Sequence, residues 1–312
     1  MWPFDAARGH RFFGGGLLSA DQAIELKQDP GGQTAAPIRV RAKPGWRAID
    51  FAELWRYREL LWILGSRDVK VRYKQTALGI LWAIIPPLFT TLIFNAIFVL
   101  LKVTPQTLSN GFPYVLFAFT AQVPWQLFAN SLSQSSNSLV GSQHLVTKVY
   151  FPRLVIPIAS LFSAVVDFLI CSAILAGIMA WYRESIELGW PLITLPFFTL
   201  LAICASLAVG LWMSALNVQY RDVRYVVPIV AQLWMYASPV VYSSVNIPEK
   251  WRPLYAVNPM ASVAEGFRWA LLGKNHPAPG PMLLVSLVSV AALLIGGLFY
   301  FKRMEKTFAD LA

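Results

Sequence analysis

The stretch LVIPIASLFSAVVDFLICSAILAGIMAW, residues 154–181, decides the fold class of this chain. It carries a single charged residue, Asp167, in a run longer than the about 20 mainly apolar residues that a membrane-crossing helix needs. A run of this length and composition is typical of a transmembrane helix and too apolar for the surface of a soluble domain. The sequence therefore predicts an integral membrane protein built from helices.

The composition of the whole chain agrees with that class. Of the 312 residues, 56% are apolar and only 13% are charged, whereas about a quarter of the residues in a soluble domain are charged. The formal net charge of +10 fits Lys and Arg side chains lying against anionic lipid headgroups. Cys171 and Cys204 both lie in apolar stretches, which is typical of small buried residues and argues against a disulfide or a metal site.

Five further apolar stretches bring the number of expected membrane spans to six. Cationic residues gather before the first span, after the second, after the fourth and behind the sixth. The positive-inside rule places such loops in the cytoplasm, so both chain termini are expected there. The expected spans are residues 78–101, 112–132, 154–181, 191–216, 226–242 and 282–301.

Three segments lie outside these spans. Residues 1–49 are rich in turn-forming residues and predict a flexible cytoplasmic tail, and residues 307–312 form a short cytoplasmic C-terminus. Residues 243–281 are aromatic and broken by prolines, which predicts short helices that re-enter the outer half of the membrane. Within that segment, the run that starts at Ala261 predicts a helix that stops at Gly273.

Residues 50–66 predict an amphipathic helix ahead of the first span. Asp50 can cap its first turn, and Glu53 follows three residues later in a capping-box arrangement. Such a helix lies in the headgroup plane with its tryptophans at the interface. It could serve as a simple anchor or as a surface for a cytoplasmic partner. Its apolar stripe consists of Phe51, Leu54, Trp55, Leu61 and Trp62.

The stretch RDVKVRYKQTALG, residues 67–79, leads into the first span and is strongly basic. These cations could simply control topology. They could also bind an anionic headgroup such as a diphosphate, because Arg forks two bonds to phosphate and Lys supplies a point charge. The candidate headgroup contacts are Arg67, Lys70, Arg72 and Lys74.

The inner loop GSQHLVTKVYFPR, residues 141–153, joins the second and third expected spans. A short helix here, with Tyr150 and Phe151 exposed, would suit a socket on another protein. His144 is expected to be a contact or a spacer, because the histidines at 10, 144 and 276 lack the spacing of metal ligands. No metal site is predicted.

Asp167 is the one clear carboxylate inside an expected span. Charge at membrane depth is costly, so this side chain should face protein or water. A proton relay usually needs a chain of acids or histidines, and none is evident in the sequence. A structural role is favoured, in which Asp167 pairs with polar groups such as Asn95, Asn130 or Ser133.

Several long blocks resemble one known family. RDVKVRYKQTALGILWAIIPPL, residues 67–88, is similar to the opening of the permease subunits of type-2 ABC exporters. The resemblance is strongest to exporters of lipid-linked O-antigen and other surface polysaccharides, with the teichoic-acid exporters nearby. It continues through residues 123–168, 217–242 and 258–272.

This resemblance implies a homodimer of the chain in the bacterial inner membrane, working with two separate ATPase subunits that bind ATP and Mg²⁺. The chain has no G-x-x-x-x-G-K-[ST] phosphate loop of its own, which agrees. The implied cargo is a polysaccharide on undecaprenyl diphosphate. The helix at 50–66 and the loop at 141–153 would seat on the ATPases, with the candidate coupling residues Glu53, Arg56, Glu59, His144, Lys148, Tyr150, Phe151 and Arg153.

The same resemblance implies that the re-entrant segment gates the exit, where the candidate residues are Trp251, Tyr255, Phe267 and Trp269. A teichoic-acid or capsule exporter is the nearest alternative. An ion-coupled secondary transporter would show intramembrane charge networks and repeated halves, and neither is evident. A membrane enzyme would show clustered His, Asp or Glu, which the scattered histidines argue against.

Overall fold

The structure, a computed structural model, describes residues 51–74, 79–102, 109, 111–148, 151–186, 188–273, 276–305 and 308. The chain divides into two units, Met1–Trp46 and Arg47–Ala312, and every described residue belongs to the second unit. The tail expected at residues 1–49 therefore lies outside the described residues.

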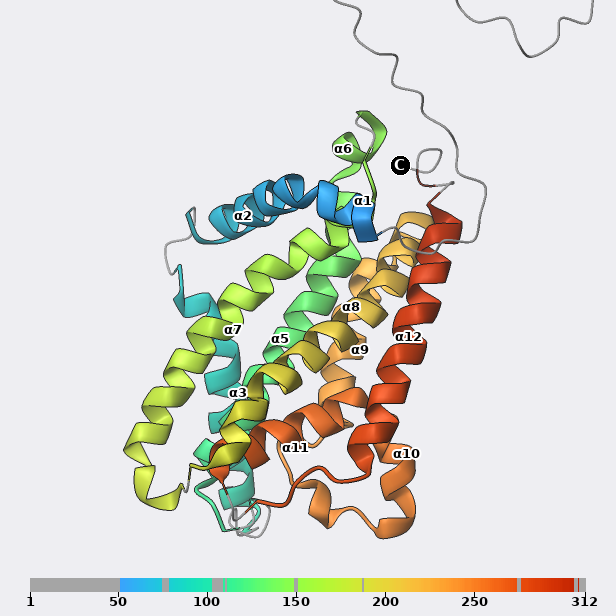
Figure 1. Cartoon of the computed structure of the whole chain (residues 1–312). Helices are drawn as coiled ribbons and strands as arrows, with labels where there is room; N and C mark the ends of the chain where they lie inside the picture. The colour runs from blue at the N-terminus through green and yellow to red at the C-terminus, as the bar shows by residue number, and fades with distance from the viewer. Residues whose placement is uncertain are drawn as a thin grey trace, which may run out of the picture. The chain divides into compact units, whose positions relative to one another are not determined.

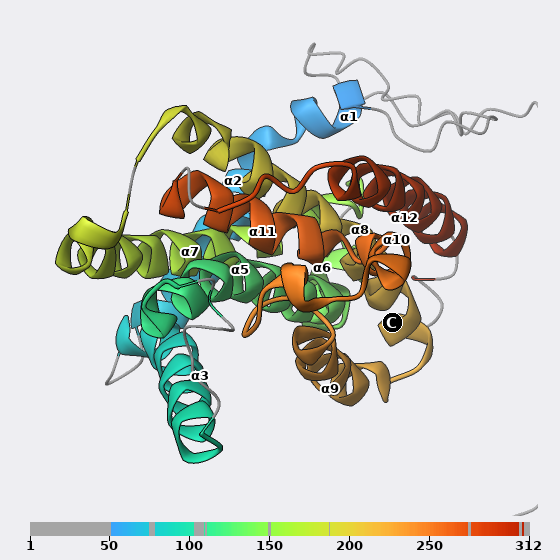
Figure 2. The ribbon, with the colours of Figure 1, turned by 90° about the horizontal axis from the view of Figure 1, so that it is seen from below.

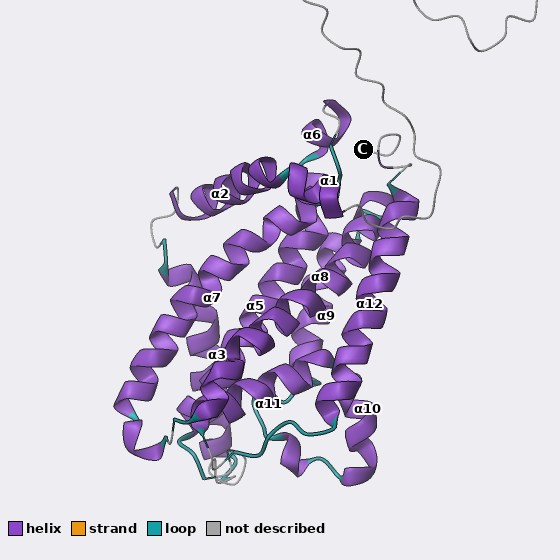
Figure 3. Ribbon diagram, viewed as in Figure 1, coloured by secondary structure: helices purple, strands orange, loops and turns teal. Residues whose placement is uncertain are grey.

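The described part of the chain is built from helices and contains no strand (Figure 3). Four helical segments are long and apolar enough to cross a membrane. They match the first, third, fourth and sixth expected spans, so these four predictions are confirmed as helices of spanning length. The four are α3 (Leu81–Leu100), α7 (Val155–Trp181), α8 (Leu195–Gln219) with the short 3-10 helix η2 (Trp190–Thr194) before it, and α12 (Met282–Met304).

Helix α5 (Tyr114–Gly141) lies at the centre of the unit and packs against α3, α7, α8 and α9. It continues to Gly141, whereas the second expected span ends at residue 132. Its buried positions include hydroxyl groups such as Ser131, Ser135 and Ser136. A helix surrounded by other helices can present polar groups to protein, which explains why α5 is less apolar than a helix that faces lipid.

Helix α9 (Val223–Tyr236) is shorter than the fifth expected span, residues 226–242. Its 14 residues extend about 21 Å, which is less than the roughly 30 Å of a hydrocarbon core. The chain turns at residues 237–242 instead of continuing the helix. Pro239 explains this end, because proline disfavours helical backbone at the residue before it.

Four short helices follow the turn, where a re-entrant segment was expected. The first three are η3 (Ser244–Asn246), η4 (Glu249–Trp251) and α10 (Arg252–Ala256). The fourth, α11 (Pro259–Leu272), confirms the helix predicted before Gly273 and starts two residues earlier than predicted. The side chain of Asn258 accepts a hydrogen bond from Met260 N, which caps α11, and Gly273 ends it at a positive φ of 84°.

The amphipathic helix expected at residues 50–66 is two helices, α1 (Phe51–Arg56) and α2 (Arg58–Lys74). Helix α2 runs across the ends of α5 and α7 (Figure 1). It includes residues 67–74 of the basic stretch that was expected to lead directly into the first span. Trp55 and Trp62 are 71% and 65% exposed. Leu54 and Leu61 pack instead against buried residues, so the predicted apolar stripe is divided between exposed and partly buried positions.

A cluster of apolar residues marks one end of the unit. It joins α2 to the later parts of α5, α8 and α12 through Leu64, Leu139, Leu211 and Phe301. At the opposite end, α11 packs against α5, and α10 lies beside α12 (Figure 1). Seen from that end, α3 and α9 lie on the same side of the unit (Figure 2), where Phe94 contacts Tyr236 edge-to-face.

Candidate functional site

Helix α2 approaches α7 closely at Gly65. A Cβ atom at this position would lie 2.6 Å from Cγ of Phe162 on α7, so a side chain larger than hydrogen does not fit. Trp62 contacts the same Phe162 ring edge-to-face, with 5.7 Å between ring centroids. This close approach brings the polar C-terminal half of α2 within reach of α5 and α7.

Asp167 is the point where the three helices meet. Its carboxylate lies on α7, is 2% exposed and accepts hydrogen bonds from groups on both other helices. Arg72 Nη2 of α2 lies 2.6 Å from Oδ2, the Tyr73 hydroxyl donates to Oδ1, and Asn130 Nδ2 of α5 donates to Oδ2 over 3.1 Å. A buried carboxylate needs such partners, because an unpaired charge at this depth is strongly unfavourable.

The partners of Asp167 are themselves held in place. Burial raises the pKa of the Tyr73 phenol well above its usual value, and the hydrogen bond to Asp167 raises it further, so Tyr73 remains a neutral donor. Gln134 of α5 contacts Ser163 of α7. With its amide turned so that the oxygen faces α2, Gln134 also accepts from Arg72 Nη1 at 3.0 Å.

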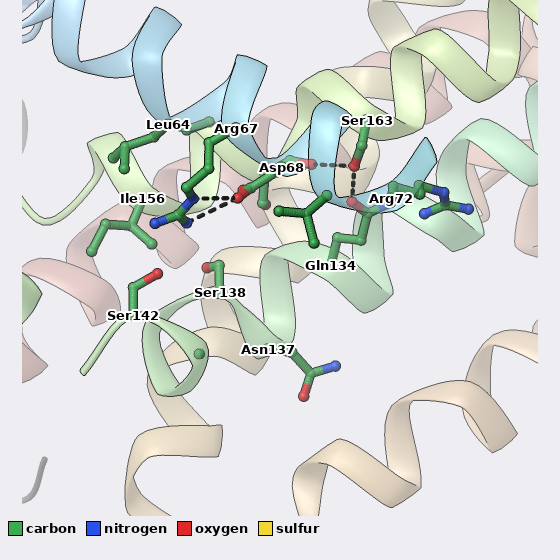
Figure 4. Close-up of a pocket in the computed structure, with 14 residues that line it drawn as sticks. Leu64, Arg67, Asp68, Arg72, Gln134, Asn137, Ser138, Ser142, Ile156 and Ser163 are labelled. Atoms are coloured by element: carbon green, nitrogen blue, oxygen red, sulfur yellow. Dashed lines mark hydrogen bonds and ion pairs between the residues drawn. The ribbon is translucent and has the colours of Figure 1, made fainter. Parts of the chain in front are cut away.

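A pocket of about 370 Å³ opens beside this cluster, between α2, α5 and α7 (Figure 4). Arg67 and Arg72 line it with hydroxyl and amide groups from α5 and α7. The Arg72 guanidinium, which pairs with Asp167, points away from the other labelled residues in Figure 4. Arg67 pairs with its neighbour Asp68 at 2.9 Å, and both side chains remain partly exposed. The polar lining consists of Arg67, Asp68, Arg72, Gln134, Asn137, Ser138, Ser142, Ser160 and Ser163.

This pocket can hold an anionic, oxygen-rich group. Guanidinium groups donate paired hydrogen bonds to phosphate oxygens, and hydroxyl and amide groups can donate the remaining ones. Arg67 donates to Asp68 from Nε and Nη2, and a guanidinium has five N–H donors, so Arg67 can donate to a bound anion as well.

The model of the ABC-2 type transporter family matches residues 59–272, a range that contains the whole pocket. The chain belongs to the ABC-2 type transporter family. The resemblance predicted from the sequence blocks is thereby confirmed, and the protein belongs among transport permeases.

Known relatives of this ABC-2 chain match over most of their length. The O-antigen export system permease protein RfbA of Klebsiella pneumoniae is 30% identical over 253 residues, 81% of this chain and 95% of the relative. RfbA of Myxococcus xanthus is 27% identical, over 81% and 96% of the two chains. The capsule polysaccharide export inner-membrane protein CtrC of Neisseria meningitidis is 24% identical, over 80% and 92%.

The four predicted headgroup cations of the ABC-2 chain separate into two pairs. Arg67 and Arg72 line the pocket. Lys70 and Lys74 are exposed on the same helix and are not among the described residues that line it. Lys70 and Lys74 lie three and seven residues after Arg67, on the same face of α2, so the pocket includes this face of the helix at Arg67 but not at the two lysines.

The predicted coupling loop contains a short helix, α6 (Gln143–Lys148), as expected. His144 is exposed on it, while the side chain of Lys148 and all of Tyr150 lie outside the described residues. The expected exposure of Phe151 is wrong, because this ring is 6% exposed and packs in the cluster with Leu64 and Phe301. Apolar contacts at the end of the helix bundle hold it there.

Arg153, the last predicted coupling residue, binds the end of α12. Its guanidinium donates to the Glu305 carbonyl oxygen, and its backbone N–H donates to Glu305 Oε1 over 3.4 Å. The guanidinium also lies 5.7 Å from the centre of the Phe308 ring. Arg153 therefore connects the start of α7 to the C-terminal end of the unit.

The coupling residues predicted on the interface helix lie on α1 and the start of α2. Arg56 and Glu59 are exposed, and the side chain of Glu53 lies outside the described residues. Asn95, a predicted partner of Asp167, lies on α3, and the pairing shown for Asp167 is with Asn130 instead. The predicted partner Ser133 is also absent from the contacts shown for this carboxylate among the described residues.

The four predicted gate residues lie in different environments. Trp251 is exposed, and Tyr255 forms a hydroxyl contact of 3.0 Å with Tyr242. Phe267 is a core residue of α11, and Trp269 contacts Trp190 edge-to-face. Only the first of them presents a large free surface in this unit.

Sequence reasoning missed two sets of residues that the structure gathers. The pocket residues of α5, Gln134, Asn137, Ser138 and Gly141, follow the spacing of one helix face, and that periodicity could have revealed them. The second set is buried at the opposite end and consists of Glu265, Arg268 and His276. An acid and an arginine three residues apart in an otherwise apolar helix were the available signal.

Proposed function

We propose that this chain is the transmembrane permease subunit of an ATP-driven exporter that moves a lipid-linked surface polysaccharide, O-antigen or a similar glycan, across the bacterial inner membrane. The observation that carries the proposal is the match to O-antigen export permeases over 95% of their length. The missing phosphate loop supports a division of labour in which a separate ATPase subunit binds ATP and Mg²⁺.

The proposed topology has six crossings, made by α3, α5, α7, α8, α9 and α12, with both termini in the cytoplasm. The cluster that joins α2 to the ends of α5, α8 and α12 supports it, because those ends are the ones whose loops are rich in cations. The turn after α9 would complete the fifth crossing, and α10 and α11 would re-enter the membrane from outside.

The proposed seats for two ATPase subunits are the helices α1, α2 and α6. Both α2 and α6 lie at the same end of the unit (Figure 1), and α6 projects from it. The exposed polar residues there include the predicted coupling residues Arg56, Glu59 and His144. The projecting helix α6 and the neighbouring α2 would give the ATPase subunit two contact points, which are connected to α5 and α7.

The proposed oligomer is a homodimer that meets through α3 and α9. Both helices expose apolar residues on the same side of the unit, among them Phe89, Ile93, Ile229 and Leu233. Faces of this kind suit lipid or a second copy, and a path for a polysaccharide between two copies requires the latter.

The pocket under α2 is the proposed place where the diphosphate of the lipid-linked substrate binds. Arg67 lines the pocket and Lys74 does not, which gives a matched pair of charge-removing variants. We expect Arg67→Gln to weaken export several-fold and Lys74→Gln to leave it near normal, measured as surface polysaccharide per inserted permease. Equal effects of the two variants would show that only the net charge of α2 matters.

The proposed exit gate lies in the segment from η4 to α11. Trp251 and Tyr255 lie on its short helices, where a small rotation would change which aromatic faces meet the path. Aromatic faces stack on the apolar faces of sugars, which suits a polysaccharide gate.

The test of the whole proposal is deletion of the chain's gene together with the gene of its cognate ATPase subunit, followed by return of each gene alone and of both. We expect surface O-antigen to disappear and lipid-linked glycan to accumulate inside the cell, and both to return to normal only when both genes are returned. A capsule polysaccharide is the second candidate cargo, because the capsule exporter CtrC also matches. Loss of capsule with normal O-antigen would select it, and unchanged surface glycans would refute both.

A further inference from the structure

Arg268 on α11 is a charged side chain with no exposed surface. Its guanidinium donates to three carbonyl oxygens in the turn that follows α9: Pro239 O at 2.6 Å, Val240 O at 2.7 Å and Tyr242 O at 3.1 Å. Its Nε donates to Phe117 O at the start of α5, over 3.3 Å. One side chain therefore binds the backbone of two other elements.

The turn at residues 237–243 has a hydrogen-bonding problem that these contacts solve. Helix α9 ends at Tyr236, so the carbonyl groups beyond it no longer have partners within a helix. A carbonyl group that is buried away from water and accepts no hydrogen bond destabilises the folded state by several kcal/mol. Arginine suits the task because it offers five N–H donors in one plane, whereas lysine offers three around a single nitrogen.

The charge of Arg268 is balanced within the same cluster. Glu265 Oε1, one turn earlier on α11, lies 3.4 Å from Arg268 Nη1 and accepts a hydrogen bond from Ser244 N at 2.8 Å. Glu265 Oε2 lies 3.3 Å from His276 Nε2. The guanidinium also lies over the Phe117 ring, 3.7 Å from its centre, in a cation–π contact.

The turn after α9 also contacts α5 and α10. The Tyr114 hydroxyl of α5 donates to Val241 O over 3.1 Å. Tyr242 contacts the Tyr255 hydroxyl of α10 at 3.0 Å. The shape of the turn therefore fixes how the end of α9 lies relative to α5 and α10.

We propose that Arg268 is a positioning residue: it replaces the missing helix partners of the turn after α9, and so holds the outer end of α9 and the neighbouring α10 in the shape that export requires. The second half of this statement rests on the proposed export function. Glu265 supports Arg268 by balancing its charge and by holding the far end of the turn at Ser244.

The deciding variant is Arg268→Lys, which keeps the positive charge and loses the planar set of donors. Arg252→Lys is its matched control, because Arg252 lies in the same segment, pairs with Glu249 three residues earlier and donates to Ile247 O, yet is partly exposed. Both are made in a chain with Val241→Cys as the reporter and with Cys171 and Cys204 replaced by Ser. Val241 is 6% exposed, so a thiol there is protected while the turn is intact.

Two measurements are made on each variant: the rate at which a membrane-impermeant maleimide labels the reporter thiol, and surface polysaccharide per inserted permease. With Arg268→Lys we expect labelling to accelerate and export to fall, each at least about tenfold, the factor expected for loss of one hydrogen bond from a charged donor. Arg252→Lys should behave as the parent. Loss of Arg268→Lys from the membrane, with Arg252→Lys present, would also support the capping role.

A protected thiol together with normal export in Arg268→Lys would overturn the proposal. Rapid labelling with normal export would overturn its second half, because the turn would then be free to open without effect on transport. If the parent chain exports no polysaccharide, the proposed function fails, and the labelling comparison still decides whether Arg268 caps the turn.

Discussion

At the scale of residues, Asp167 shows how one intramembrane carboxylate can organise three helices. Its partners come from α2 and α5, and they satisfy both carboxylate oxygens. Among the described residues, the contacts shown join the carboxylate to a guanidinium, a phenol and an amide. This arrangement favours the structural role over a proton relay, which would need a further acid or histidine in line.

Asp167→Asn tests that role. The amide keeps the size of the side chain but removes the charge that pairs with Arg72, so we expect a loss of about 1–3 kcal/mol of stability, seen as a lower Tm of the purified permease. Arg72→Gln should have a similar effect, and the double variant should lose less than the sum, because the two changes remove the same interaction.

The matched control for Asp167→Asn is Glu249→Gln, which removes the carboxylate of an ion pair in which Glu249 is 90% exposed. Exposed pairs contribute little, so its Tm should not change measurably. Strictly additive effects at Asp167 and Arg72 would contradict a direct coupling between them.

The sequence predicted only part of the residue-scale picture. Pairing of Asp167 with Asn130 was predicted from the cost of charge at membrane depth, and the structure contains it. Pairing of Asp167 with Arg72 was not predicted, because contacts between residues far apart in the chain depend on how helices pack. The predicted exposure of Phe151 was wrong for the same reason, since an aromatic ring in a loop can be exposed or can pack at the end of a bundle.

At the scale of elements, the position of α2 depends on its contact with α7 at Gly65. Gly65→Ala introduces a methyl group against the Phe162 ring. We expect this overpacking to lower the free energy of unfolding by about 1–3 kcal/mol. We also expect export to fall, because α2 must move away from the pocket. The measurement is the Tm of the purified permease together with surface polysaccharide.

Gly177→Ala is the control for this element. It lies within α7, and a Cβ there would meet nothing within 4 Å. Replacement of glycine by alanine in a helix interior should leave stability unchanged or raise it by about 0.5–1 kcal/mol. Equal destabilisation at both glycines would show that the close approach of α2 does not matter.

Helix α6 and the residues behind it should separate docking from stability. Phe151→Ala removes a buried ring and should cost about 3–5 kcal/mol of stability. His144→Ala changes an exposed side chain on α6 and should leave the Tm unchanged while several-fold less ATPase subunit is retained on purification. Unchanged retention with His144→Ala would remove this residue from the proposed docking surface.

Periodicity and apolar length predicted which elements exist better than where they end. The four most apolar helices match their predicted spans closely. The interface helix was predicted to stop at residue 66 and α2 continues to Lys74, because its polar last turns bind α5 and α7 where a free helix would fray. The fifth helix stops before Pro239, which disfavours helical backbone at the residue before it, whereas apolar composition alone would continue the helix. Arg268 donates to the carbonyl groups of the turn that follows.

At the scale of the whole molecule, the family follows from long sequence blocks and from a match over residues 59–272. The unit has a polar pocket and projecting short helices at one end, and a buried charged cluster at the other. In the proposed exporter, the first end would bind the charged substrate and the ATPase subunit, and the second end would form the exit.

The most direct test of the central claim is transport in sealed vesicles that contain the purified permease, its cognate ATPase subunit and lipid-linked O-antigen polysaccharide. Transfer across the membrane is measured as the glycan's protection from an added glycan-cleaving enzyme. We predict transfer that requires ATP and both subunits together. Transfer by the permease without the ATPase, or no transfer with both subunits and ATP, would contradict the claim.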